Sequence, residues 1–277
     1  MLFHTAHNLA RADPMMQAPI EHRALSAWRF QCSATTHPGA VRLHNEDSYV
    51  NRPDLGLWAV ADGAGGHQAG EVASRIIADA LNSVSTGIDG AELLAEVRHC
   101  LARAHNALLR EAARRGPQAM IVSTIVALLL RDDYYACLWA GDSRAYLLRG
   151  QRFRQLTRDH SLVQELFDAG AISAAEALHH PSANIITRAI GAEGLELDKV
   201  TDRLFPGDRF LLCTDGLFKA LPERELAELL AADEDIIADQ LVIAGLRAGA
   251  ADNLTAVTVE VTLDDRAGAM WAETRHA

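Results

Sequence analysis

The chain has 277 residues, of which 49% are hydrophobic, enough to bury the core of one large domain or of two small ones. Its formal net charge of -11 at pH 7 argues against nucleic acids and anionic membranes as partners, because both attract basic surfaces. The four cysteines are widely spaced and form no CxxC pair, so the sequence predicts buried thiols in a reducing compartment and no structural zinc site.

Residues 1–26 contain no apolar stretch long enough for a signal peptide, and we expect a loosely ordered tail there. No later segment approaches the roughly 20 apolar residues of a membrane helix, so a cytoplasmic protein is expected. Seven runs have the length and composition of strands: 30–36, 55–61, 121–130, 134–140, 144–150, 209–214 and 254–263. Helical periodicity or end signals mark four segments: 71–84, 91–115, 222–230 and 234–249.

Short links join three of the predicted strands. "RDD" connects 121–130 to 134–140, and "GDS" connects 134–140 to 144–150, so both are predicted to be hairpins in a largely antiparallel sheet. Strands come in groups with helices between the groups, which predicts an α+β fold with layered packing. No repeat or low-complexity linker divides the chain, so we expect one domain over 27–264 and a C-terminal tail over 265–277.

The stretch "WAVADGAGGHQAG" (58–70) places glycines directly after an apolar run, as phosphate-binding loops do. It fails both nucleotide motifs. Gln68 stands at the third glycine of GxGxxG, and Glu71 stands where the P-loop has its lysine. On this stretch alone, a tight turn between a strand and a helix and a ligand role for Asp62 both remain open.

Acidic residues recur where apolar runs begin or end: Glu46, Asp47, Asp62, Asp142, Asp215 and Asp252. Each one alone is an ordinary turn former. If they converge at one sheet edge they repel one another, and burying them unpaired costs several kcal/mol. A hard divalent cation resolves this conflict. Ligands with oxygen donors alone favour Mg²⁺ or Mn²⁺ over Zn²⁺.

Seven motifs occur in the order found in the metal-dependent protein phosphatases, the type 2C serine/threonine phosphatases, and the chain resembles the compact bacterial members of that family. The motifs are "GAVRLHNEDS", "WAVADGAGGHQAG", "STIVALL", "AGDSRAYLLRGQRFRQLTRDHS", "IITRAIG", "GDRFLLCTDGL" and "ADNLTAVTVEV". The resemblance spans about residues 30–262 and implies an α-β-β-α sandwich, in which two mainly antiparallel β-sheets are flanked by helices. The stretch 56–70 is also similar to that of phosphatases that accompany type VI secretion.

The resemblance implies two core metal ions, Mg²⁺ or Mn²⁺, at one edge of the sandwich. Asp62 would bridge both ions, and the backbone carbonyl of Gly63 would bind one of them. Asp215 and Asp252 would complete the carboxylate ligands. Glu46 would act through a metal-bound water.

The remaining motif residues take supporting roles by the same resemblance. Arg42 would grip the substrate phosphate, since a guanidinium can hold two phosphate oxygens. Asp142 would share a weaker third ion with Asp215. Asp47 would lie behind the ligands, and Asn253 is expected beside the site rather than as a ligand.

The implied reaction is direct attack on phosphorus by a metal-bridging hydroxide, without a phosphoenzyme. The substrates would be phosphoserine and phosphothreonine in proteins that a bacterial kinase has modified, so the enzyme would oppose that kinase. We expect it to be a monomer. Two other functions stay open: an inactive relative that binds phosphoproteins as a scaffold, and a hydrolase of small phosphate esters. Retention of Asp62, Asp215 and Asp252 argues against the first. The second stays open because the flap, expected over 162–186, would set which substrates enter the site.

The chain departs from some family members two residues after Asp62. Those members carry a histidine there, proposed as the general acid, whereas this chain has Ala64. His67 stands at a different offset and does not inherit the role. His160, in the motif that precedes the flap, is expected to be structural.

Overall fold

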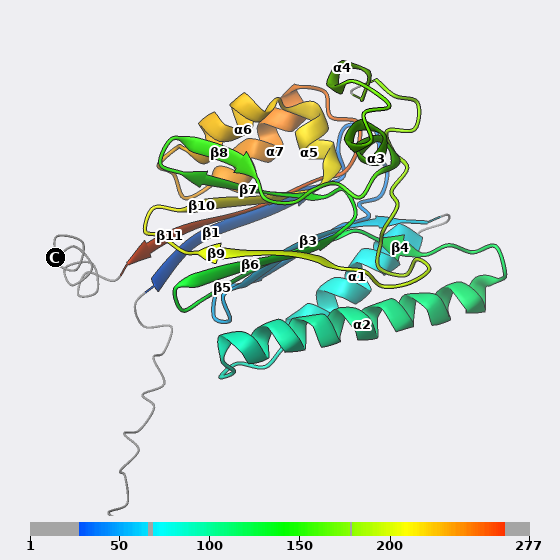
Figure 1. The fold of residues 1–277 in the computed structure, drawn as a ribbon, viewed down its shortest axis with the longest axis horizontal. Helices are drawn as coiled ribbons and strands as arrows, with labels where there is room; N and C mark the ends of the chain where they lie inside the picture. The colour runs from blue at the N-terminus through cyan, green and yellow to red at the C-terminus, as the bar shows by residue number, and fades with distance from the viewer. Residues whose placement is uncertain (1–27, 66–68, 178, 264–277) are drawn as a thin grey trace, which may run out of the picture.

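The computed structural model describes residues 28–65, 69–177 and 179–263, so the predicted tails and His67 lie outside the described residues. Two antiparallel β-sheets lie face to face at its centre, and helices cover the outer face of each sheet (Figure 1). This arrangement confirms the layered α+β fold class that the sequence predicts.

The first sheet has five strands, and its neighbouring strands are antiparallel. In spatial order they are β1 (Trp28–His37), β11 (Leu254–Leu263), β10 (Arg209–Cys213), β7 (Arg144–Arg149) and β8 (Arg152–Gln155).

The second sheet is also antiparallel, and a short strand joins it at the end of β3. In spatial order its strands are β2 (Asp47–Arg52), β3 (Leu57–Ala64), β5 (Ile125–Arg131), β6 (Tyr134–Ala140) and β9 (Asp198–Arg203), with β4 (Val122–Ser123) paired to β3.

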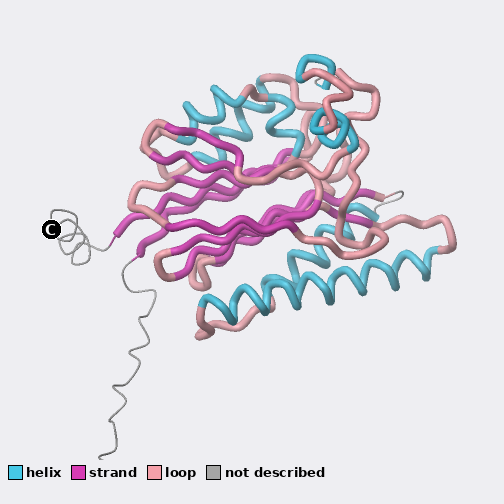
Figure 2. Tube along the Cα trace, in the orientation of Figure 1, coloured by secondary structure: helices cyan, strands magenta, loops and turns pink. Residues whose placement is uncertain are grey.

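Helices form the two outer layers, as Figure 2 shows. The second sheet is covered by α1 (Ala69–Asn82) and α2 (Gly90–Arg115). The first is covered by α5 (Asp215–Ala220), α6 (Glu223–Leu230) and α7 (Ile237–Arg247). Two short helices, α3 (Leu162–Asp168) and α4 (Ala174–Ala177), belong to the predicted flap. None of the helices in the described part of the chain has the length and apolar character to cross a bilayer.

Alternating side chains of β3 show how the layers are built. Trp58 and Val60 point into the space between the two sheets, whereas Leu57 and Ala59 point toward α1 and α2. In the middle layer the ring of Trp58 meets that of Phe30, from the first sheet, edge to face at 5.2 Å between centroids. Because both faces of β3 are buried, its sequence is an almost unbroken apolar run that stops at Asp62.

The structure corrects one predicted hairpin. The "RDD" link joins β5 and β6 as expected, with Ile125 opposite Ala140. The predicted pairing of β6 with β7 is wrong, because β6 lies between β5 and β9 while β7 lies between β10 and β8 in the other sheet. Gly141, with a φ of 111°, carries the chain from one sheet to the other in a backbone conformation that favours glycine. The crossing places Asp142 between strand ends of both sheets.

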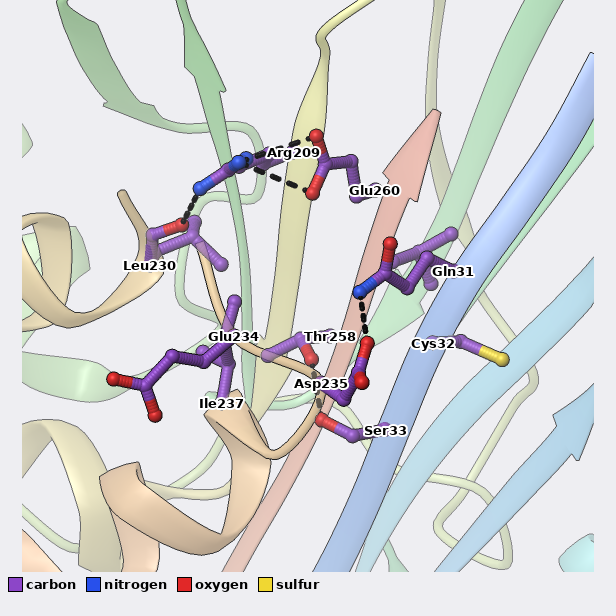
Figure 3. Close-up of a pocket in the computed structure, with 11 residues that line it drawn as sticks. Gln31, Cys32, Ser33, Arg209, Leu230, Glu234, Asp235, Ile237, Thr258 and Glu260 are labelled. Atoms are coloured by element: carbon purple, nitrogen blue, oxygen red, sulfur yellow. Dashed lines mark hydrogen bonds and ion pairs between the residues drawn. The ribbon is translucent and has the colours of Figure 1, made fainter. Parts of the chain in front are cut away.

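Polar contacts fasten the beginning of α7 to the first sheet at the crevice shown in Figure 3. The side-chain amide of Gln31 donates to Asp235 at 2.5 Å, and Ser33 Oγ accepts from a backbone N–H of α7 at 2.9 Å. Arg209 pairs with Glu260 on the adjacent strand at 3.1 Å. The crevice leaves only about 10 Å³ of free space, so it is a packed joint and not a ligand site.

Candidate metal centre

The acidic residues singled out by the sequence gather where strands of both sheets end. Asp47 on β2 lies directly opposite Asp62 on β3, so their side chains lie on the same face of the second sheet. A cavity of about 600 Å³ opens at this edge. Its lining includes every predicted site residue except Asp47: Arg42, Glu46, Asp62, Gly63, Asp142, Asp215, Asp252 and Asn253.

Asp62 lies near the end of β3, where Thr124 fixes its backbone. The Asp62 N–H donates to Thr124 Oγ1 at 3.0 Å, and its carbonyl accepts from the Thr124 N–H at 2.8 Å. Burial raises the pKa of the Asp62 carboxyl well above its usual value. Four other aspartates raise this pKa further through their negative charge: Asp47, Asp215, Asp142 and Asp252. The carboxylates are therefore close enough to repel one another.

Asp47 is buried. One of its carboxylate oxygens accepts hydrogen bonds, and the other has no hydrogen-bond partner within the described residues. Oδ2 accepts from the hydroxyls of Thr214 and Thr255, each at 2.7 Å. Oδ1 is buried and makes no hydrogen bond within the described residues. Burial raises the pKa of Asp47 to about 7, although the two threonine hydrogen bonds lower it. A cation or its bound water would satisfy this buried oxygen.

The loop that carries Asp142 is held from two sides. Ser143 Oγ and Thr124 Oγ1 share a hydrogen bond of 2.7 Å, which ties the loop to the segment that fixes Asp62. His160 Nδ1 accepts from the Gly141 N–H at 3.2 Å. In the structure, then, His160 supports the Asp142 loop and lies outside the cavity lining.

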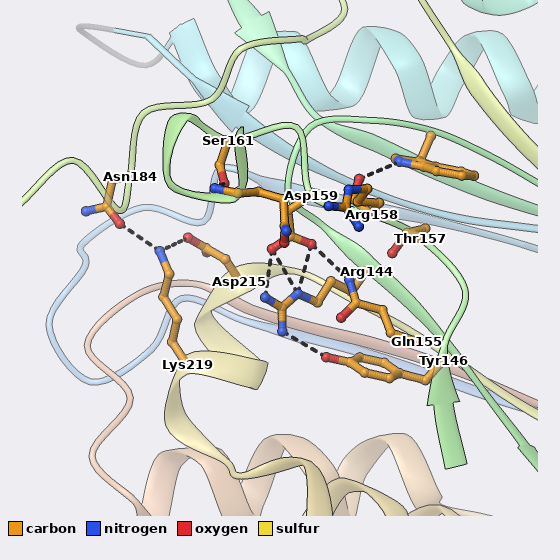
Figure 4. A network of polar contacts seen from close by, with 12 residues as sticks. Arg144, Tyr146, Gln155, Thr157, Arg158, Asp159, Ser161, Asn184, Asp215 and Lys219 are labelled. Atoms are coloured by element: carbon orange, nitrogen blue, oxygen red, sulfur yellow. Dashed lines mark hydrogen bonds and ion pairs between the residues drawn. The ribbon is translucent and has the colours of Figure 1, made fainter. Parts of the chain in front are cut away.

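Asp215 is the first residue of α5, and it is paired with a lysine from the same helix. Lys219 Nζ lies 2.6 Å from Asp215 Oδ2 and 2.8 Å from Asn184 Oδ1 (Figure 4). Its charge also acts on Asp142. Burial and then Asp215 raise the pKa of Asp142 to about 7, while Lys219 lowers it.

Arg42 lies in the loop between β1 and β2, with 54% of its side chain exposed. Its Nη2 lies 2.9 Å from Asp252 Oδ2. Asn253 clamps the loop: its Oδ1 accepts from the Glu46 N–H at 2.8 Å, and its Nδ2 donates to two carbonyls of the same segment at 2.9 and 3.0 Å. The backbone beneath Arg42 is therefore fixed, whereas its guanidinium is exposed to solvent.

Glycines allow the end of β3 and the start of α1 to approach closely. A Cβ on Gly63 would lie 1.9 Å from the carbonyl oxygen of Gly70. A Cβ on Gly70 would lie 2.5 Å from Glu46 Oε1 and 2.6 Å from the Gly63 carbonyl oxygen. Side chains at either position would clash. The same geometry brings the Gly63 carbonyl and the Glu46 carboxylate to one side of Gly70.

The donor set suits a hard divalent cation, since carboxylate and carbonyl oxygens are the ligands that Mg²⁺ and Mn²⁺ prefer. The unpartnered buried oxygen of Asp47 fits a cation in the same place. Within the described ranges, however, no three His, Cys, Asp or Glu side chains are arranged to hold an ion by themselves. Two of the expected ligands are instead paired with internal cations, Asp252 with Arg42 and Asp215 with Lys219. An ion at Asp252 would compete with Arg42, whereas the Lys219 contact at Asp215 Oδ2 leaves Oδ1 for an ion.

Sequence reasoning missed the hydroxyl groups and the lysine of this site. The hydroxyl residues are Ser143, Thr124, Thr214 and Thr255. Two of them, Ser143 and Thr214, stand next to an aspartate in the sequence, and that adjacency is the signal that could have found them. Lys219 stands one helical turn after Asp215, a spacing that brings side chains together.

Comparison with known proteins gives a consistent result. A family model described as Protein phosphatase 2C matches residues 40–242. The serine/threonine phosphatase stp of Listeria monocytogenes is 34% identical over 241 residues, which cover 83% of this chain and 96% of that protein.

Two solved structures are similar over most of the chain. The structure of PppA, described as a key regulatory component of the type VI secretion system in Pseudomonas aeruginosa, is 41% identical with a TM-score of 0.78, covering 84% of this chain and 97% of that one. The catalytic domain of the serine/threonine protein phosphatase PstP, in complex with two manganese ions, is 33% identical with a TM-score of 0.73, covering 85% and 99%.

We expect the metal-free chain to lose stability as pH rises from about 4 to about 8. Asp47 and Asp142 have a folded-state pKa of about 7 against an ordinary value of 3.8, so the folded state binds more protons in this window. Its free energy of unfolding therefore falls as pH rises. Asp47→Asn removes one such group and should raise the free energy of unfolding at pH 8 by up to about 4 kcal/mol, with little change near pH 4.

Urea denaturation in excess chelator at the two pH values measures this difference. Asp133→Asn, on the exposed β5–β6 hairpin, is the matched control and should follow the wild type at both pH values. An Asp47→Asn variant that is less stable than wild type at pH 8 would contradict the charge assignment.

Proposed function

The chain belongs to the protein phosphatase 2C family of serine/threonine phosphatases, and we propose that it removes phosphate from phosphoserine and phosphothreonine of proteins at the carboxylate-lined cavity. One observation carries the assignment to this cavity. Five acidic side chains at or near the ends of strands of both sheets line it together with Arg42: Glu46, Asp62, Asp142, Asp215 and Asp252.

Phosphatases of this family depend on metal ions, and the related PstP catalytic domain is in complex with two manganese ions. In this chain Asp62, Asp215 and Asp252 would hold Mg²⁺ or Mn²⁺, together with the Gly63 carbonyl and with Glu46 through water. When bound, such ions supply an activated water for in-line attack on phosphorus and positive charge that stabilises the phosphate oxygens. Without that charge the cavity would repel a phosphate dianion.

Arg42 would bind and orient the phosphate. Its planar guanidinium can donate to two phosphate oxygens at once. The clamp made by Asn253 fixes the loop, so the exposed side chain can turn from Asp252 to the substrate without movement of the backbone. Binding of phosphate by Arg42 would then release Asp252 for a cation.

Exposed apolar side chains around the cavity favour a protein substrate over a small phosphate ester. Met120 and Ile185 line the cavity and are 66% and 50% exposed. Val41 and Leu43 flank Arg42 and are 69% and 92% exposed. Apolar groups spread over this width extend beyond the reach of a sugar phosphate, and they can contact the residues next to a phosphorylated side chain.

The similarity to PppA supports a further part of the proposal. That protein is described as a regulatory component of type VI secretion. We place this chain in the same kind of control, where it would reverse phosphorylation by a bacterial serine/threonine kinase.

A substrate panel tests the proposed reaction. The full chain should hydrolyse a phosphothreonine peptide with Mn²⁺ or Mg²⁺, at least tenfold faster in kcat/KM than a sugar phosphate or a nucleotide, and excess chelator should abolish turnover. Asp62→Asn is the inactive control. Full activity in chelator would contradict the metal assignment, and tight peptide binding without turnover would indicate the scaffold instead.

Arg42→Ala should mainly weaken recognition of phosphate. The loss of a charge-assisted bidentate contact should lower kcat/KM by roughly 2–3 kcal/mol, or about 30- to 150-fold, while Mn²⁺ affinity does not fall. Arg152→Ala, at an exposed arginine on β8, is the control. An Arg42→Ala variant within twofold of wild type would place Arg42 outside the site.

Ala64 predicts how the rate depends on the leaving group. Ala64 is exposed in the cavity lining, and none of the side chains of residues 63–65 can donate a proton to the leaving group. Alkoxide leaving groups need a proton more than phenolates do, so we expect rates to fall steeply as the pKa of the leaving group rises.

Ala64→His should flatten this dependence, whereas Ala64→Gln, similar in size but not titratable, should leave it unchanged. A series of substituted phenyl phosphates and a phosphothreonine peptide measures the slope for all three proteins. A flat series for the wild type would mean that another donor already acts.

A further inference from the structure

We propose that the Lys219 ammonium is a built-in cation of the centre, which takes the place of a third metal ion between Asp142 and Asp215 and ties Asp215 to the flap. The inference rests on the proposed function, because it concerns the same carboxylates. It differs from the sequence expectation that Asp142 and Asp215 share a weaker third ion.

The contacts of Lys219 carry the inference. Its Nζ lies 2.6 Å from Asp215 Oδ2 and 2.8 Å from Asn184 Oδ1, so one ammonium joins α5 to the segment that follows α4 (Figure 4). The ammonium is also close enough to Asp142 and Asp252 for their charges to act on it, so three of the expected ligands surround it.

The platform beneath Lys219 is fixed. Arg144 makes a bidentate pair with Asp159, with contacts from 2.7 to 3.1 Å, and its guanidinium lies 3.8 Å from the centre of the Phe218 ring on α5. The four-residue spacing on the helix then directs Lys219 back toward Asp215. Asp215 has only 16% of its side chain exposed, and Lys219 has 42% exposed, so one partner of the pair is largely shielded from solvent.

Composition separates Lys219 from an ordinary charged residue. The chain has 26 basic residues of the Lys and Arg types, and only two of them, Lys199 and Lys219, are lysines. A lysine ammonium is a compact point charge with three donors, close in shape to a small cation, whereas the arginine guanidinium is a planar fork. One of the two lysines thus stands between the carboxylates of the site.

The consequence is a fixed number of metal ions. A third divalent ion would need oxygens of both Asp142 and Asp215, but Oδ2 of Asp215 is engaged and the ammonium repels a second cation nearby. Asp215 Oδ1 remains available to a core ion. We expect two ions in the wild type and a third only when the ammonium is removed.

Calorimetric titration of the metal-stripped full chain with Mn²⁺ tests the count. Wild type should bind two ions, and Lys219→Asp should bind three. The affinity of Lys219→Asp for the third ion should exceed that of the wild type by at least tenfold. Lys219→Ala should also gain a third site, weaker than that of Lys219→Asp, and it serves if the aspartate variant does not fold. Lys199→Asp, at the exposed other lysine on edge strand β9, should keep two.

Each outcome is decisive. Two ions in wild type and in both Lys219 variants, or three ions in all of them, would overturn the inference and leave the proposed function intact. No Mn²⁺ binding by the wild type would instead overturn the proposed function.

Hydrogen exchange of residues 162–186 measures the link to the flap without any metal. Asn184→Ala and Lys219→Ala should both exchange faster than wild type in this segment, and Lys199→Ala should not. Unchanged exchange in both variants would show that the ammonium does not hold the flap.

Discussion

Repulsion among carboxylates shielded from water governs the chemistry of this site. Asp47, Asp62 and Asp142 lie where strands of two sheets end, and burial raises the pKa of each one. The fold tolerates them because hydroxyl groups hold one side of the cluster, as Thr214 and Thr255 hold Asp47. The protein's own side chains do not supply enough positive charge to balance these carboxylates, and a divalent cation would supply it.

Two internal cations pair with different members of this cluster, and they differ in how they are held. Arg42 comes from an exposed loop and pairs with Asp252, so its guanidinium can leave for a phosphate. Lys219 comes from a helix that is packed on Arg144, and it also contacts the flap. Arg42 can therefore exchange its partner, whereas Lys219 keeps Asp215. The difference follows from the elements that carry them.

Much of the fold could be predicted from the sequence, because apolar runs and helical periodicity report burial directly. The acidic residues that line the cavity could also be predicted, since strand ends and motif order identify them. The prediction of a β6–β7 hairpin was wrong, because a short link does not determine which sheet the next strand joins. Here the chain passes to the other sheet at Gly141, whose positive φ favours glycine. Lys219 and the hydroxyl of Thr124 could not be predicted, because their partners come from distant segments such as Asn184 and Ser143.

In the proposed function the carboxylate cluster is a two-ion centre organised around Asp62. Anomalous X-ray diffraction at the manganese edge, from crystals of the full chain grown with Mn²⁺, tests it most directly. We expect two anomalous peaks inside the cavity, with the Asp62 carboxylate contacting both ions and Arg42 turned away from Asp252. A cavity without a peak, or manganese bound only at surface carboxylates, would contradict it.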